Sequence, residues 1–365
     1  MKFVLNKPDS YAYSVDPRSD NGCLLPFKRI EIQGTGDISI CCPSWLPEYC
    51  GNILTSTPEE LLKNVNRTAI LNDMAVGKFT YCNDTCPHLN FYLTTGKVER
   101  AGISIVPINT LLSVLGKNRF VIGFSYDRSC NLQCPSCRKE LIINKLDNST
   151  QSVNISAIHL KVKELIDYLM LRGDKIRLVL TGSGDPFASP LYWSYLIELS
   201  KMSLPSDFEI SLMTNGVLMT ESTWAEIQPL WKHIHFVDVS IDAAKEDTYN
   251  IVRKNGNFSR LKKNLTLFDQ MVAERKFPNL FSWQTSMVVQ SANYRELKEY
   301  AEWQLTYSSL KNISINRILH WGHLTNDEYK RLDIIDLAEL TKILSNPVFK
   351  HPYIKLGNLS GFVNR

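Results

Sequence analysis

The chain has 365 residues, of which 44% are hydrophobic and 21% are charged, close to the averages of folded globular proteins. This composition excludes a disordered, collagen-like or coiled-coil protein, and the length allows two or three domains. The formal net charge is only +4 and basic residues do not cluster, so the charge predicts no nucleic-acid partner. Because no apolar run approaches the ~18 residues of a membrane span and no signal peptide is recognisable, we expect a cytoplasmic protein.

The cysteines are concentrated in the N-terminal part of the chain. An odd number of them, without an export signal, argues against a disulfide framework and favours metal ligation. All nine lie within the first 137 residues: Cys23, Cys41, Cys42, Cys50, Cys82, Cys86, Cys130, Cys134 and Cys137.

The first predicted elements are a hairpin and a helix that carry cysteines. Residues 23–41 read C-x(12)-G-x(4)-C, and the segment between the two cysteines predicts a β-hairpin that turns at residues 34–36. A helix with a capping box formed by Thr57 and Glu60 then runs through residues 58–74 and precedes Cys82 and Cys86. A hairpin and a helix that bring four thiols together predict a compact cluster-binding module.

Cys130, Cys134 and Cys137 form a C-x(3)-C-x(2)-C motif directly after an apolar run, 120–126, that reads as a buried strand. Three closely spaced thiolates suit a cubane 4Fe-4S cluster in which one iron stays open, whereas structural clusters and structural zinc sites normally use four protein ligands. The alternative is a zinc site completed by a distant residue such as His88.

From residue 118 to 325, strand-like and helix-like segments alternate, which is typical of a parallel sheet wound with helices. The helix at 158–171 places Leu160, Val162, Ile166 and Leu169 near one face, and another at 293–305 follows a candidate cap at Asn293. Six segments are predicted strands: 120–126, 176–182, 208–216, 235–242, 281–290 and 312–319.

The cysteine motif and the six βα units resemble the radical S-adenosylmethionine (SAM) enzymes, and the resemblance covers nearly the whole chain. It implies an α/β fold with a partial (βα)6 barrel of the TIM type, in which chemistry gathers at the C-terminal ends of the strands. It also implies that an electron from the cluster cleaves SAM to methionine and a 5'-deoxyadenosyl radical, which abstracts hydrogen from a substrate. The family usually carries an aromatic residue where this chain has Ser136.

The same resemblance implies a SAM-binding set. Glycines let the backbone approach the methionyl ammonium, Asp185 takes the place of the family's usual Glu, and Arg253 could pair with the SAM carboxylate. The alternatives are an ordinary turn at 182–186, a cap by Asp242 for a helix near Lys245, and a solvated helix-end cation at Arg253. The implied residues are Gly182, Ser183, Gly184, Asp185, Ser240, Asp242 and Arg253.

Four further residues are candidates for a substrate pocket. Gln284 lies in the fifth predicted strand among apolar neighbours, and His320, Trp321 and His323 follow the sixth. The alternative is that each is an ordinary side chain with its polar groups satisfied locally. No catalytic residue can be assigned from this sequence.

The N-terminal cysteine pattern resembles the SPASM and twitch auxiliary-cluster domains of radical SAM enzymes, although those domains usually follow the barrel. The resemblance implies a second 4Fe-4S cluster held by Cys23, Cys41, Cys82 and Cys86. Cys42 is the alternative ligand, because neighbouring residues in a strand point to opposite faces. The alternative to a cluster is a structural zinc site, since the two kinds of site share ligand types.

These observations predict four segments: an auxiliary-cluster module at 1–95, a linker at 96–118, a core barrel at 119–325, and a helix with a tail at 326–365. We expect a radical SAM enzyme that modifies a peptide or protein and takes its electron from flavodoxin or ferredoxin. One alternative is a radical oxidoreductase acting on a sugar or small metabolite. The alternative from another class is a non-catalytic zinc-binding scaffold or RNA-binding module.

Overall fold

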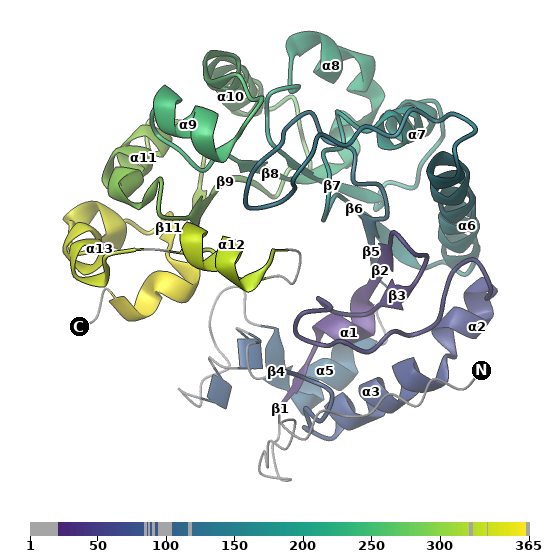
Figure 1. Cartoon of the computed structure of the whole chain (residues 1–365). Helices are drawn as coiled ribbons and strands as arrows, with labels where there is room; N and C mark the ends of the chain where they lie inside the picture. The colour runs from purple at the N-terminus through teal and green to yellow at the C-terminus, as the bar shows by residue number, and fades with distance from the viewer. Residues whose placement is uncertain are drawn as a thin grey trace. The chain divides into compact units, whose positions relative to one another are not determined.

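The computed structural model describes residues 21–83, 86, 88–89, 92–93, 104–115, 119–320, 324–333 and 335–362 (Figure 1). The chain divides into two compact units, residues 1–126 with 154–177, and residues 127–153 with 178–365. The first unit holds the six N-terminal cysteines, and the second holds Cys130, Cys134 and Cys137. None of the helices in the described part of the chain is long and apolar enough to cross a membrane.

The second unit is built on a parallel sheet, as the alternating pattern predicts. The strands β7, β8, β9, β10 and β11 are neighbours in chain order and each of these pairs is parallel. The predicted strands run up to two residues past the observed ends. The bounds are β6 Lys175–Leu180, whose end belongs to this unit, β7 Glu209–Thr214, β8 Ile234–Ser240, β9 Ser282–Val289, β10 Asn312–Arg317 and β11 Ile354–Lys355.

Helices cover one face of this sheet (Figure 1). On β9 the buried Trp283 packs edge-on against Phe268 of α10 at 5.4 Å between ring centroids, whereas its neighbour Gln284 faces the opposite side and is half-buried. The helices of this unit, of which α7 to α11 lie on that face, are α7 Pro190–Ser200, α8 Glu221–Glu226, η1 Gln228–His233, α9 Glu246–Val252, α10 Phe258–Ala273, η2 Tyr294–Glu296, α11 Leu297–Gln304, α12 Asn326–Leu332, α13 Leu337–Leu344, η3 Pro347–Lys350 and η4 Gly357–Phe362.

The first unit contains the predicted hairpin. Its strands β2 (Arg29–Gln33) and β3 (Ile38–Ser39) are antiparallel, and the turn places Gly36 at φ 84°, where a side chain would be strained. The strand β2 also pairs in parallel with β5 (Arg119–Ser125). The other elements are β1 Asn21–Cys23, antiparallel to β4 Ile105–Pro107, with α1 Leu25–Lys28, α2 Pro58–Leu62, α3 Val65–Ala75, α5 Ile108–Leu115 and most of α6 Thr150–Leu171.

Two helix predictions in this unit need correction. The capping box of Thr57 and Glu60 is confirmed, but the helix it starts ends at Leu62, because the Asn64 side chain accepts the next free amides and caps α3. In α6, three of the four residues predicted to share a buried face are buried, whereas Leu160 is 58% exposed. A residue two positions from Val162 lies well round the helix from it, so the prediction for Leu160 was wrong.

The C-terminal segment also differs from the prediction. One helix was expected after residue 325, but α12 and α13 are separate helices with their own caps at Thr325 and Asp336. The predicted tail forms the two-residue strand β11 beside β10 and then the helix η4.

Candidate functional site

The cysteine loop of the second unit is organised around Asp127, whose side chain is fully buried. Its carboxylate accepts hydrogen bonds from the Ser129 amide at 2.9 Å, the Ser129 hydroxyl at 2.8 Å, the Asn144 side chain at 2.5 Å and the Ser189 hydroxyl at 2.5 Å. Ser189 caps α7, so one carboxylate ties both ends of the loop to a helix of the sheet. Buried charge-assisted bonds of this kind fix a loop firmly.

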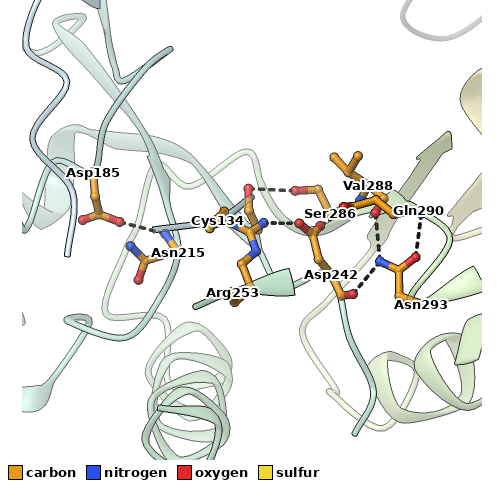
Figure 2. Close-up of polar contacts among 10 residues, drawn as sticks. Cys134, Asp185, Asn215, Asp242, Arg253, Ser286, Val288, Gln290 and Asn293 are labelled. Carbon is orange, nitrogen blue, oxygen red and sulfur yellow. Dashed lines mark hydrogen bonds and ion pairs between the residues drawn. The ribbon is translucent and has the colours of Figure 1, made fainter. Parts of the chain in front are cut away.

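The three thiols of this loop lie in a polar and mostly buried environment. Cys130 and Cys134 are buried, and Cys137 is half-buried. Burial raises the pKa of Cys130 to about 12, and the Asp185 carboxylate adds to the rise. Each thiol accepts an N–H bond from a different side chain: Cys130 from Asn215 at 3.6 Å, Cys134 from Arg253 at 3.7 Å and Cys137 from Arg138 at 3.6 Å (Figure 2 shows the first two donors).

The segment predicted to bind SAM after β6 packs against the cysteine loop. Gly182 is exposed, and the Ser183 carbonyl accepts a bond from Arg138 at 2.7 Å. A Cβ on Gly184 would lie 2.5 Å from the Ser129 carbonyl oxygen, so the close approach of the two backbones requires glycine here. The turn predicted from the Gly-Ser-Gly-Asp sequence is therefore also the contact that holds the loop.

Asp185 is buried at 1% exposure, and its carboxylate is already occupied by bonds from within the unit. It accepts from the Thr214 hydroxyl and the Asn215 amide, both at 2.8 Å, and from the Phe187 amide at 3.0 Å. Burial raises the pKa of Asp185, and these donors oppose the rise. The Asn215 backbone amide binds this carboxylate while its side chain donates to Cys130, so Asn215 links the Asp185 carboxylate to the cysteine loop.

Asp242 follows β8 and joins the polar network shown in Figure 2. It has the unusual φ of 65° for a residue with a side chain. Its carboxylate accepts from the Val288 amide at 2.7 Å and pairs with Arg253 at 2.9 Å, while its carbonyl accepts from Asn293 at 2.7 Å. Ser240, the other candidate on this strand, shares a 3.2 Å hydroxyl contact with Ser286.

Both capping predictions near this network were wrong. Asp242 does not cap α9, because the N-cap position is Lys245 and the Lys245 side chain makes no capping hydrogen bond. The backbone amides of Ala244 and Lys245 instead donate to the Glu296 carboxylate of η2. Asn293 does not cap the following helix, because its side chain is used by Asp242 and by the end of β9.

Arg253 is not a solvated cation at a helix end, since its side chain is only 12% exposed. Burial alone lowers the pKa of this guanidinium, but the Asp242 carboxylate and the Cys134 thiol more than offset that effect, and the net pKa is raised. Arg253 is therefore a fixed positive charge at the cysteine loop.

Of the substrate-pocket candidates, Gln284 lies in a row of polar side chains across three strands. It donates to Asp238 at 2.6 Å and accepts from Asn312 at 2.6 Å. Burial raises the pKa of Asp238 to about 6, a perturbation the sequence analysis missed, although an Asp between two valines in an apolar strand is a signal. His320 is exposed and lies edge-on to Tyr329, while Trp321 and His323 lie outside the described residues.

The first unit brings four of its thiols together. Burial, followed by neighbouring thiols, raises the pKa of Cys23 and of Cys41 to about 12. Burial also raises the pKa of Cys82, and the further contributions come from Cys23, Cys86 and Cys41. Every pair among these four cysteines interacts in this way, so the four residues chosen from the sequence are near one another.

The two remaining cysteines of this unit differ from each other. Cys42 acts on both Cys41 and Cys86, as a residue at the edge of the group would. Burial raises the pKa of Cys50 to about 12, but the charges acting on it come from Arg67 and Glu48. This separates Cys50 from the four grouped thiols.

Among the described residues, no three His, Cys, Asp or Glu side chains converge tightly enough for a single metal ion. The thiolates of a cubane bind different irons, so they need not converge on one point. His88, the proposed fourth ligand of a zinc site, accepts the Ser104 amide at 3.3 Å and lies edge-on to Trp45.

Comparison with known proteins agrees with this geometry. Residues 125–303 match the family model described as the radical SAM superfamily, so the chain contains a radical SAM domain. Members of that superfamily are enzymes that cleave SAM reductively with a 4Fe-4S cluster and carry out radical chemistry. The match gives no support to the non-catalytic scaffold or RNA-binding module.

Forty solved chains match the structure, among them the crystal structure of SuiB from Streptococcus suis. The two share 14% sequence identity with a TM-score of 0.43, over 73% of this chain and 59% of that chain. The chain thus spans less than two thirds of that protein's length. No curated protein matches the sequence.

Proposed function

We propose that this protein is a radical SAM enzyme that holds a 4Fe-4S cluster through Cys130, Cys134 and Cys137. The observation that carries the proposal is a loop at the start of the radical SAM domain whose three thiols each accept an N–H bond from a separate side chain. Soft thiolates are the ligands that iron-sulfur clusters use, and N–H donors stabilise their negative charge. When bound, the cluster supplies the electron that cleaves SAM to methionine and a 5'-deoxyadenosyl radical.

The chain's own residues prepare this site. Asp127 fixes the loop, and Gly184 lets the segment after β6 approach it. We assign the SAM-contacting role to Gly182, Ser183 and Gly184 on one side and to Ser240 on another. Asp185 and Asp242 act through Asn215 and Arg253, since the Asp185 carboxylate accepts the Asn215 backbone amide and the Asp242 carboxylate pairs with the Arg253 side chain.

The proposal extends to the rest of the chain. It includes a partial (βα)6 barrel at 119–325, an N-terminal module at 1–95 with a second 4Fe-4S cluster on Cys23, Cys41, Cys82 and Cys86, a linker at 96–118 and a C-terminal segment at 326–365. What supports the second cluster is the mutual effect of the four thiols on their pKa values. The electron donor in this proposal is flavodoxin or ferredoxin, and the location is the cytoplasm.

The proposed substrate is a peptide or protein, and its support is the resemblance of the N-terminal cysteine pattern to SPASM and twitch domains. A sugar or another small metabolite is the alternative. Mass spectrometry of peptide libraries incubated anaerobically with the enzyme, SAM and reductant tests this choice. A peptide that loses hydrogen or gains deuterium only with SAM present supports the proposal, while modification of sugars alone would reverse it.

The central activity is tested by assaying 5'-deoxyadenosine from SAM with dithionite after anaerobic reconstitution. The triple variant Cys130→Ala, Cys134→Ala and Cys137→Ala should reduce product at least 1000-fold, since no group remains to deliver the electron. The matched control is Cys50→Ala, a buried cysteine outside both proposed sites, which should retain the product. Cleavage of SAM by the triple variant would contradict the proposal.

A further inference from the structure

Two arginines, the buried Arg138 and the half-buried Arg253, contact thiols of the cysteine loop, and each is held by other parts of the protein. Arg138 donates to the Cys137 sulfur at 3.6 Å and also to the carbonyls of Arg128 at 2.6 Å and Ser183 at 2.7 Å. Its side chain thus joins the cysteine loop to the segment after β6, and the residue is only 7% exposed. With two carbonyls as anchors, the guanidinium keeps its place beside Cys137.

Arg253 reaches the loop from the end of α9 and is anchored differently. It donates to the Cys134 sulfur at 3.7 Å and pairs at 2.9 Å with Asp242, which the Val288 amide holds in turn (Figure 2). Within the described part of the chain the buried Arg253 Nε has no hydrogen-bond partner. A buried polar group without a partner costs free energy, so the fold accepts a cost to keep this guanidinium at the thiol.

The two guanidinium groups therefore differ in the charge of the groups that anchor them. Arg138 is anchored by neutral carbonyls and brings a full positive charge to Cys137. Arg253 is paired with the Asp242 carboxylate, which offsets part of its charge at Cys134. The third donor, the Asn215 amide at Cys130, is neutral.

Hydrogen bonds to cluster sulfurs and nearby positive charge stabilise the reduced form, which carries one more negative charge, and so raise the reduction potential. We propose that Arg138 and Arg253 are positioning residues that raise the potential of the cluster, and that Asp242 moderates the contribution of Arg253. Reduction adds one electron from the donor protein to the cluster, and no bond to these side chains forms or breaks. This inference rests on the proposed function, because it needs a cluster on the loop.

The test is a potentiometric titration of the reconstituted full-length protein, followed by electron paramagnetic resonance. The signal that changes on addition of SAM identifies the loop cluster. The variants are Arg138→Met, Arg253→Met and Asp242→Asn, with Arg295→Met as control because Arg295 is an exposed arginine paired with Glu339, and its loss changes the net charge equally. Iron content and thermal unfolding are measured for each.

The arginine variants should lower the midpoint potential and Asp242→Asn should raise it, while Arg295→Met leaves it unchanged. We expect Arg138→Met to give the largest shift, at least a tenfold fall in the ratio of reduced to oxidised cluster at a fixed potential, which corresponds to about 59 mV for one electron. Opposite shifts from removing opposite charges are a signature that a purely structural role would not produce.

The outcomes distinguish a failure of the proposed function from a failure of this inference alone. Wild-type protein that binds no iron-sulfur cluster would end the proposed function itself. Variants that hold full iron and titrate like Arg295→Met would overturn the inference alone. If Arg138→Met cannot hold iron, the midpoint potential of Asp242→Asn tests the inference instead. Asn at this position keeps an acceptor for the Val288 amide. A midpoint potential that is unchanged or lower in this variant contradicts the inference.

Discussion

The two groups of cysteines in this chain have different surroundings. The thiols of the cysteine loop come from eight consecutive residues and meet two guanidinium groups and an amide. The four thiols of the first unit come from separate segments, and after burial they are affected by one another and by backbone N–H groups, such as that of Leu25 at Cys23 and that of Leu89 at Cys86. The first group therefore receives side-chain N–H donors, two of them cationic, whereas the second receives backbone N–H groups and the more distant charge of Arg29 at Cys41.

This difference has a thermodynamic meaning. Thiols must lose their protons to bind metal, so a raised thiol pKa makes binding compete with protons. A bound metal would have to displace the protons of Cys23 and Cys41 in the first unit and of Cys130 in the loop, because burial raises each of these pKa values to about 12. At the loop, Arg253 opposes the rise that burial causes in the pKa of Cys134.

The largest expected effect comes from removing the anchor of the loop alone. Asp127→Ala leaves up to four buried donors without their acceptor, which costs about 3–5 kcal/mol of the free energy of unfolding and should release the loop cluster. The group in the first unit should keep its iron. Chemical denaturation and iron analysis check this, with Asp147→Ala as control, because Asp147 is an exposed aspartate of the same loop. Equal losses in both variants would contradict the role of Asp127.

The second prediction concerns which cysteines of the first unit bind iron. Cys41 and Cys50 are both buried with pKa values raised to about 12, but only Cys41 interacts with other thiols. Cys41→Ser should therefore lose about four irons per chain, while Cys50→Ser should lose none. If Cys50→Ser loses as much iron as Cys41→Ser, the ligand set is different from the one proposed.

A smaller effect is expected where the segment after β6 meets the loop. An alanine Cβ at Gly184 would lie 2.5 Å from the Ser129 carbonyl oxygen and 2.9 Å from that of Asp127. Overpacking of this kind costs about 1–3 kcal/mol, and we expect slower SAM cleavage with less change in the first unit. Gly361→Ala is the control, because no heavy atom lies within 4 Å of its Cβ position. Unchanged unfolding and cleavage in Gly184→Ala would show that the contact is dispensable.

Much of the fold could be predicted from the sequence because its signals are local. Alternating apolar segments located the strands of the sheet, and the capping box of Thr57 and Glu60 located the start of α2. What failed depended on tertiary context. The strand β11 has only two residues and no periodic pattern, and Asn64 divides a helix by a side-chain cap that a continuous helical pattern hides.

The candidate site likewise has one part that local sequence signals predict and another that depends on tertiary contacts. The spacing of the three loop cysteines is a local signal, whereas the partners of their thiols come from positions up to 119 residues away. Asp127 and Arg138 lie beside the motif and carried no recognised signal, because their roles depend on which groups surround them after folding. Arg253 was expected either to bind SAM or to face solvent, and burial against Asp242 excludes the second reading.

We propose that the two groups of thiols hold separate clusters and that only the cluster of the loop cleaves SAM. We would reconstitute wild type, the triple alanine variant of Cys130, Cys134 and Cys137, and the triple alanine variant of Cys23, Cys41 and Cys82, then count iron and sulfide and record Mössbauer spectra. We expect about eight irons in wild type and about four in each variant, with SAM cleavage lost in the loop variant. Full iron in the loop variant, or a colourless wild type that holds only tetrahedral zinc, would contradict this proposal.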